Sequence, residues 1–208
     1  MEINGFMGAF YNISVKVSKL AYVNILWITF TLAGLCVFGF MPATVAMFAV
    51  MRKWTNNITN VRVFQTFWDH YKSEFIKSNL LGGILLILGL MLYANFQLIQ
   101  EPKLLESMLR VVLLFISVLF LIAVLFIFPV YVHFQLKAPL YLRTALILGM
   151  AYPHYTFMMA VCLYVLQEVF MFIPGLMPFF AASLISYLLM WFSNKVFKKV
   201  EDKQERYS

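Results

Sequence analysis

Charged side chains are scarce in this sequence, and their scarcity excludes an ordinary soluble domain. Only 12% of the 208 residues are charged and 63% are hydrophobic, whereas soluble domains carry about 25% charged and roughly 45–50% apolar residues. The chain has two cysteines, Cys36 and Cys162, and both lie in apolar stretches. This pattern excludes a disulfide framework. The net charge of +7 is scattered rather than gathered into a basic stripe, so nucleic acid is not an expected partner.

Recognisable catalytic motifs are also missing. The sequence has no phosphate-binding glycine loop, no nucleophile elbow and no HExxH motif. Its three histidines, His70, His133 and His154, share no ligand spacing, and a metal site needs three or four convergent ligands. We therefore expect no enzyme activity, no cofactor and no metal site.

Long stretches without charged residues dominate the chain, namely residues 20–51, 78–100, 111–136, 144–167 and 169–194. About 20 apolar residues span the hydrocarbon core, so each of the last four stretches predicts one crossing, the final one beginning after the turn at residues 173–178. A single helix over the first stretch would be about 48 Å long, against a core of about 30 Å. The first stretch must therefore be broken.

The break is expected in the segment 39–44, with Gly39, Pro42, Ala43 and Thr44 as a structural turn. Proline lacks a backbone donor and disfavours helical geometry at the residue before it, and glycine permits a turn. This predicts a helical hairpin over residues 21–56. Its second arm, from Ala43 to about Asn56, is short and either crosses fully or re-enters.

The basic residues favour about six helices with both termini in the cytoplasm, because Lys and Arg accumulate in cytoplasmic loops. If the basic tail is cytoplasmic, the hairpin leaves only Lys103 and Arg110 of the 16 basic residues outside. The five-crossing alternative also places Lys16 and Lys19 outside. The prediction is an all-α polytopic membrane helix bundle forming one domain over residues 1–208. It contains an interfacial helix (1–20), the hairpin (21–56), an amphipathic elbow (60–79), four spanning helices (78–194) and a cytoplasmic tail (195–208).

The elbow differs from the other segments because its aromatic residues recur three and four positions apart, with polar residues mostly between them. These aromatics are Phe64, Phe67, Trp68, Tyr71 and Phe75, and their spacing is that of an amphipathic helix. Such a helix can lie in the headgroup layer of the membrane. Aromatic residues are also enriched in protein interfaces, so the same stripe can be a partner-binding surface. The sequence leaves both interpretations open.

One acidic residue, Glu168, lies between two long apolar runs. A carboxylate inside a membrane is costly and is therefore a candidate for proton or substrate contact. Its position about five residues before the external turn also allows a structural role, in which it reaches water or pairs with Arg110 or Lys103. Both readings stay open.

Four segments together resemble the YesL-like family of small bacterial integral membrane proteins. They are Gly39-Phe40-Met41-Pro42-Ala43-Thr44-Val45-Ala46, Met51-Arg52-Lys53-Trp54, Phe64-Gln65-Thr66-Phe67-Trp68 and Phe75-Ile76-Lys77-Ser78-Asn79-Leu80-Leu81. Members are typically encoded beside carbohydrate ABC importers. The resemblance thus implies an accessory subunit of the bacterial inner membrane, in contact with lipid and with the permease subunits of a sugar importer. It supplies no catalytic residues.

A second hypothesis is a stand-alone small-solute transporter or channel, with Glu168 and other polar residues lining its path. The sequence does not determine the oligomeric state.

Overall fold

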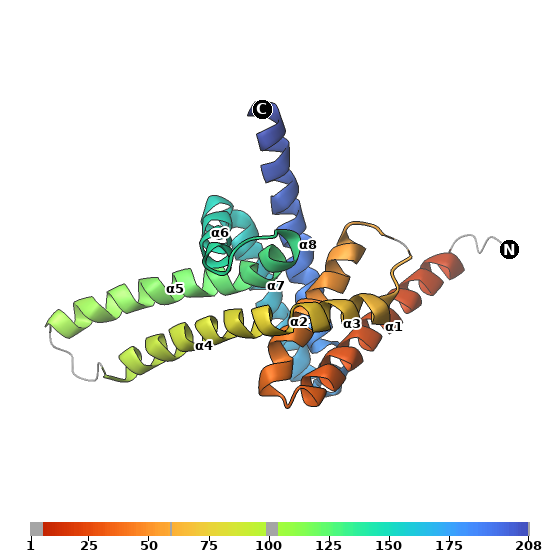
Figure 1. The fold of residues 1–208 in the computed structure, drawn as a ribbon, viewed down its shortest axis with the longest axis horizontal. Helices are drawn as coiled ribbons and strands as arrows, with labels where there is room; N and C mark the ends of the chain where they lie inside the picture. Colours follow the sequence, from red (N-terminus) through yellow and green to blue (C-terminus); the bar gives the residue numbers. More distant parts are fainter. Residues whose placement is uncertain (1–5, 59, 99–103, 208) are drawn as a thin grey trace.

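The computed structural model describes residues 6–58, 60–98 and 104–207, and these residues form helices without any strand. The helices are α1 (Phe6–Ala33), α2 (Val37–Thr55), α3 (Val63–Ser73), α4 (Phe75–Leu98), α5 (Leu104–His133), α6 (Ala138–Ala151), α7 (Pro153–Phe172), the short 3-10 helix η1 (Pro174–Leu176) and α8 (Met177–Tyr207). Figure 1 shows their arrangement. The predicted polytopic helical bundle is confirmed.

Among the described residues, five segments are long and apolar enough to cross a membrane. They are Ile13–Ala33, Phe75–Gln97, Ser107–His133, Pro153–Phe172 and Pro174–Glu205, in α1, α4, α5, α7 and at the end of the chain with α8. The chain is therefore built as a membrane protein. Its orientation in the membrane stays a prediction.

Helix α2 is the centre of the bundle. Every residue from 42 to 51 is buried, and the helix packs against α1, α3, α4, α5 and α8. A helix that is apolar on all sides and buried on all sides belongs in a core rather than at a surface. The second arm of the predicted hairpin is thus the element around which the other helices assemble.

The hairpin of α1 and α2 is present, but its predicted break is misplaced. Helix α1 ends at Ala33, the turn lies at residues 34–36, and Gly39, Pro42, Ala43 and Thr44 all belong to α2. The turn is made by Leu35 and Cys36, which have φ angles of 58° and 60°. Only a few per cent of non-glycine residues adopt this left-handed region, and Gly34 is the one usual turn former among the three turn residues.

Pro42 remains inside α2 because a neighbouring helix replaces its missing hydrogen bond. Proline leaves the carbonyl four residues earlier without a helical donor, and that carbonyl belongs to Phe38. The side-chain Nδ2 of Asn79 in α4 donates to the Phe38 oxygen at 2.9 Å. Side chains of neighbouring helices commonly satisfy such freed groups in membrane proteins.

Gly39 is required for close helix contact rather than for a turn. A β-carbon at Gly39 would lie 2.5 Å from the backbone oxygen of Thr31 and 2.9 Å from the Cα of Gly34. Gly34 in the turn and Gly39 in α2 therefore let the two backbones approach closely.

Other predicted boundaries also shift. The elbow helix is α3 alone and ends at Ser73, so residues from Phe75 onward belong to α4. Helix α1 runs without interruption from Phe6, so no separate interfacial helix precedes the first span. The stretch 144–167 is divided between α6 and α7, which begins at Pro153. The tail after residue 195 continues α8 to Tyr207 rather than leaving the helix.

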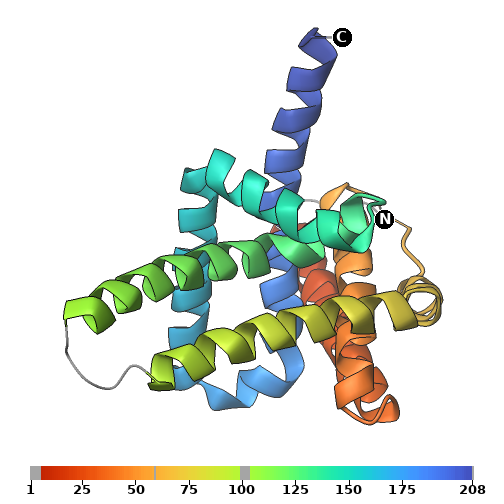
Figure 2. The same ribbon diagram turned by 60° about the vertical axis from the view of Figure 1, so that its left-hand side comes forward.

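Helices α4 and α5 lie side by side and extend away from the other helices (Figure 1, Figure 2). We call this pair the arm. Only 22% of the most apolar window of α4 and 17% of that of α5 is buried within the chain. Apolar surface of this extent is stable only when lipid or another protein covers it.

The basic ends of several helices meet on one face of the bundle. Arg52 at the end of α2 donates to the backbone carbonyl of Val132 at the end of α5. Nearby, Nε2 of His133 lies 3.1 Å from Oε1 of Glu201 in α8, and Asn194 of α8 donates to Asn56 at 2.8 Å. The ends of α2 and α5 and the last part of α8, which the distribution of basic residues assigns to the same side of the membrane, thus lie together.

Candidate functional site

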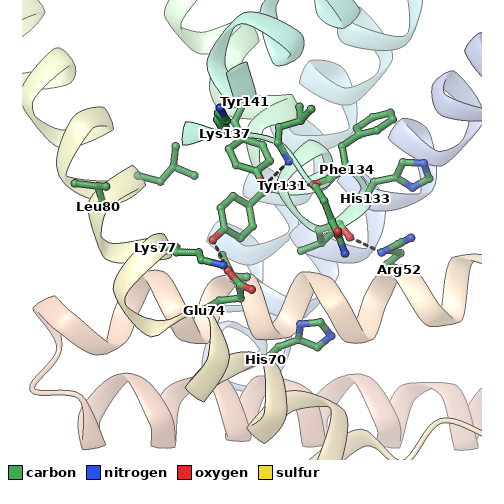
Figure 3. A pocket seen from close by; sticks show the side chains of 15 residues that line it. Arg52, His70, Glu74, Lys77, Leu80, Tyr131, His133, Phe134, Lys137 and Tyr141 are labelled. Atoms are coloured by element: carbon green, nitrogen blue, oxygen red, sulfur yellow. Dashed lines mark hydrogen bonds between the residues drawn. The ribbon is translucent and has the colours of Figure 1, made fainter. Parts of the chain in front are cut away.

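A cavity of about 770 Å³ opens on this basic face, between the end of α2, the junction of α3 and α4, the end of α5 and the start of α6 (Figure 3). Binding pockets for small ligands typically measure about 300–1,000 Å³. Its charged lining residues are Arg52, Glu74, Lys77 and Lys137. We call it the basic cavity.

Two tyrosines shape the wall of the basic cavity. The Tyr131 hydroxyl donates to Oε2 of Glu74 at 2.7 Å, and the rings of Tyr131 and Tyr141 lie 4.7 Å apart, centroid to centroid. The Tyr141 hydroxyl accepts the backbone N–H of Leu136 at 3.1 Å. These contacts join the junction of α3 and α4 to α5 and α6, so the cavity is a part of the packed structure.

The charge of the basic cavity is positive. Arg52, Lys77 and Lys137 supply three positive charges against one negative charge from Glu74, an excess of two. Arg52 is held by the backbone carbonyl of Val132. Within the part of the chain that the structure describes, neither Lys77 nor Lys137 forms a salt bridge. Such a site favours an anion.

His70 of α3 also lines the cavity. Burial lowers the pKa of His70 below its ordinary value of 6.5, and the nearby charges of Lys53 and Arg52 lower it further, whereas Glu74 and Asp69 raise it. His70 is therefore mainly neutral at pH 7 and adds no charge there.

Among the described residues, no group of three or more His, Cys, Asp or Glu side chains is placed to hold a metal ion. The basic cavity contains donors for an anion but no cluster of metal ligands.

The aromatic stripe of the elbow points into the protein. Phe67 is fully buried and Tyr71 almost so. The ring of Phe30 in α1 lies 5.3 Å from that of Phe67 and 5.0 Å from that of Tyr71. The Tyr71 hydroxyl donates to the backbone carbonyl of Phe30 at 3.1 Å. The stripe therefore fastens α3 to the hairpin.

The partner-binding prediction is wrong for Phe67 and Tyr71, because their side chains are already covered by this chain. Phe75 and Trp68 are partly buried, and the Trp68 ring lies 5.4 Å from Phe30. Phe64, with 51% of its surface exposed, is the member of the stripe most open to a partner. For Phe64, Trp68 and Phe75 the role stays a prediction.

Glu168 lies in the last turns of α7, is exposed and is not among the residues lining the basic cavity. Lys103, one of its two suggested ion-pair partners, lies outside the described residues. Asn24, a polar residue inside the first apolar run, has a structural role. It donates to the carbonyl of Pro178 at 2.6 Å and accepts the N–H of Ser183 at 3.0 Å, which joins α1 to the start of α8.

The sequence reasoning missed the basic cavity. In the sequence, Arg52, Lys77 and Lys137 each border an apolar run on the same predicted side of the membrane. Their location on the same predicted side is the feature of the sequence that could have indicated a shared basic site. It could not show that the ends of α2, α4 and α5 converge, because the spacing of apolar runs does not determine which helices are neighbours.

A family model described as "Protein of unknown function, DUF624" matches residues 20–96. Similar chains in Bacillus subtilis (strain 168) are named Uncharacterized protein YteU, YesL and YesV. YteU is 42% identical, covering 97% of this chain and 90% of its own length. YesL is 36% identical with coverage of 91% and 90%, and YesV is 37% identical with 89% of each chain. No solved structure matches. Because similarity at these levels extends over almost the whole chain, the protein belongs to the YesL-like family, together with YteU, YesL and YesV.

Proposed function

We propose that this protein is a non-catalytic accessory subunit of a bacterial carbohydrate ABC importer and binds the permease subunits in the plane of the membrane. The observation that supports this proposal best is the arm of α4 and α5, whose apolar surface extends beyond the bundle (Figure 2). The partner class comes from the family resemblance, since the names of the similar chains state no activity.

One flank of α4 is suited to a partner helix. Ile76, Leu80 and Ile87 recur at helical spacing with exposed fractions of 81%, 60% and 58%. Gly83 lies between them, and a β-carbon added there would meet no described atom within 4 Å. Small residues at such positions let two membrane helices pack closely. We call these four residues the α4 flank.

Lipid chains could cover the α4 flank equally well, so the decisive experiment must separate a packed helix from fluid lipid. Gly83→Leu does so, because a leucine on a lipid-facing surface costs nothing, whereas in a close helix contact it overpacks the interface. Overpacking typically costs about 1–3 kcal/mol, which is roughly a fivefold to 150-fold loss of affinity.

The measurement is recovery of permease subunits with the tagged protein in mild detergent from its native host, quantified by mass spectrometry. The wild type should retain two permease subunits and the ATPase, and Gly83→Leu should retain about a fifth of that amount or less. The matched control is Ala160→Leu, a small exposed residue on α7, which should leave recovery unchanged.

Equal recovery with Gly83→Leu would remove the α4 flank from the interface. Recovery of the wild type alone, under conditions that keep a known importer intact, would contradict the accessory role. That second result would favour the stand-alone transporter, for which Glu168→Gln and solute uptake in a host without the importer are the next test.

A further inference from the structure

The basic cavity opens sideways onto an apolar surface. Leu81 in its lining is buried, whereas Leu80 is 60% exposed and belongs to the α4 flank as well. Figure 3 shows Leu80 at the edge of the group, with Lys77 and Glu74 on the adjoining turns. A ligand in this cavity can therefore have a polar end among the charges and an apolar end along α4.

The polar end of such a ligand must be an anion with several oxygen atoms. Lys77 and Lys137 approach the cavity from different elements, and both are exposed and without an ion pair in the described part of the chain. Arg52 adds a guanidinium whose position is fixed by Val132. A phosphate group can accept charge-assisted hydrogen bonds from several such donors at once.

Glu74 narrows the class of headgroup. Its Oε2 accepts a hydrogen bond from the Tyr131 hydroxyl, which fixes the carboxylate in the cavity wall next to Lys77 (Figure 3). This carboxylate repels any negatively charged group that lies directly against it, but it accepts hydrogen bonds from hydroxyl groups. The ligand should thus carry hydroxyl groups next to its phosphate.

We infer that the basic cavity binds the phosphate headgroup of an anionic, hydroxyl-bearing membrane lipid such as phosphatidylglycerol, with the acyl chains along Leu80 and the α4 flank. The cavity lies at the start of α4 and the end of α5, where the apolar spans Phe75–Gln97 and Ser107–His133 meet the basic face. Lipid phosphates lie just beyond the ends of apolar spans, so this position suits a lipid headgroup. Basic pockets between membrane helices on the cytoplasmic side hold anionic headgroups, and the distribution of basic residues predicts that this face is cytoplasmic.

The test is native mass spectrometry of the purified full chain in detergent, titrated separately with dioleoylphosphatidylglycerol, dioleoylphosphatidylcholine and inorganic phosphate. The double variant Lys77→Gln, Lys137→Gln should bind phosphatidylglycerol roughly 25-fold more weakly than the wild type, because each basic residue near an anionic lipid contributes about fivefold. The charge-conserving pair Lys77→Arg, Lys137→Arg should retain binding.

The matched control removes the same charge elsewhere. Lys16 and Lys19 of α1 are exposed and do not line the basic cavity, so Lys16→Gln with Lys19→Gln should leave the affinity unchanged. Equal affinity of the cavity variant and the wild type would overturn the inference. So would equal binding of phosphatidylcholine and phosphatidylglycerol, or saturation by inorganic phosphate at the lipid concentration, which would assign the site to a soluble ligand.

Discussion

The hydrogen bond between Asn79 and Phe38 gives a sharp test of how α4 is attached to the central helix. Pro42 leaves the Phe38 carbonyl without its helical donor, and Nδ2 of Asn79 donates to it at 2.9 Å. The same Nδ2 group donates to Phe75 within α4 at 2.8 Å. If Asn79 is present in order to compensate for Pro42, the two substitutions must be coupled.

Asn79→Ala should destabilise the wild type by about 1 kcal/mol, the typical net contribution of one hydrogen bond, since it leaves the Phe38 carbonyl without its donor. Pro42→Ala restores a backbone N–H that can bond to Phe38, so in that background Asn79→Ala should cost close to nothing. The bond to Phe75 is lost in both backgrounds and cancels in the double-mutant cycle. The expected coupling energy is therefore about 1 kcal/mol.

The assay is unfolding of the four proteins in one detergent, followed by tryptophan fluorescence. For a chain of this size, 1 kcal/mol corresponds to a shift of about 2–4 °C in the unfolding temperature. If Asn79→Ala lowers that temperature equally with Pro42 and with Ala at position 42, the compensation argument is refuted.

Matched substitutions test the packing of the hairpin and elbow and the charge state of the cavity. Gly39→Ala should lower the unfolding temperature, because its β-carbon would lie 2.5 Å from a backbone oxygen. Gly83→Ala should instead stabilise the protein by up to about 1 kcal/mol through helix propensity. A higher unfolding temperature for Gly39→Ala than for Gly83→Ala would contradict the close contact at Gly39. Phe67→Ala should lower the free energy of unfolding by about 3–5 kcal/mol, because the side chain is fully buried. Phe64→Ala should lower it by less than half of that, because Phe64 is half exposed. Equal losses would mean that Phe67 is not part of the hydrophobic core. Burial lowers the pKa of His70 in the folded protein. As the pH falls below about 6.5, the unfolded chain therefore binds a proton at His70 before the folded protein does, and the folded state loses stability. Between pH 7.5 and 5.5 the unfolding temperature of the wild type should therefore fall more than that of His70→Gln. Equal decreases would mean that burial does not lower the pKa of His70.

The helical architecture could be predicted because it depends on the length of uncharged runs, which the sequence states directly. The hairpin was also predictable, since residues 20–51 exceed the length of one span. Its turn was not, because Leu35 and Cys36 adopt the left-handed region while the usual turn formers, Gly39 and Pro42, lie inside α2. Their presence there depends on Gly34 and Asn79, which only the folded structure brings close.

The candidate site was less predictable than the fold, for a physical reason. An aromatic stripe on an amphipathic helix has the same pattern whether it faces lipid, a partner or the chain's own hairpin. Phe30, which covers Phe67 and Tyr71, is an ordinary residue of an apolar run. In the same way, Lys77 and Lys137 line one cavity only because the start of α4, the end of α5 and the start of α6 lie close together in the folded chain.

Helix α4 carries both proposed sites, and its geometry allows them to be tested separately. Lys77 directs its charge to the basic cavity, whereas a side chain at Gly83 would enter open space on the α4 flank. Removing the lysine charge should alter lipid selectivity without adding bulk to the flank, and Gly83→Leu adds bulk without changing charge. Leu80 belongs to both surfaces, so a lipid bound in the cavity would form part of the surface that a partner helix meets. The lipid is then a structural component of that interface, and permease binding should depend on it only if both proposals hold.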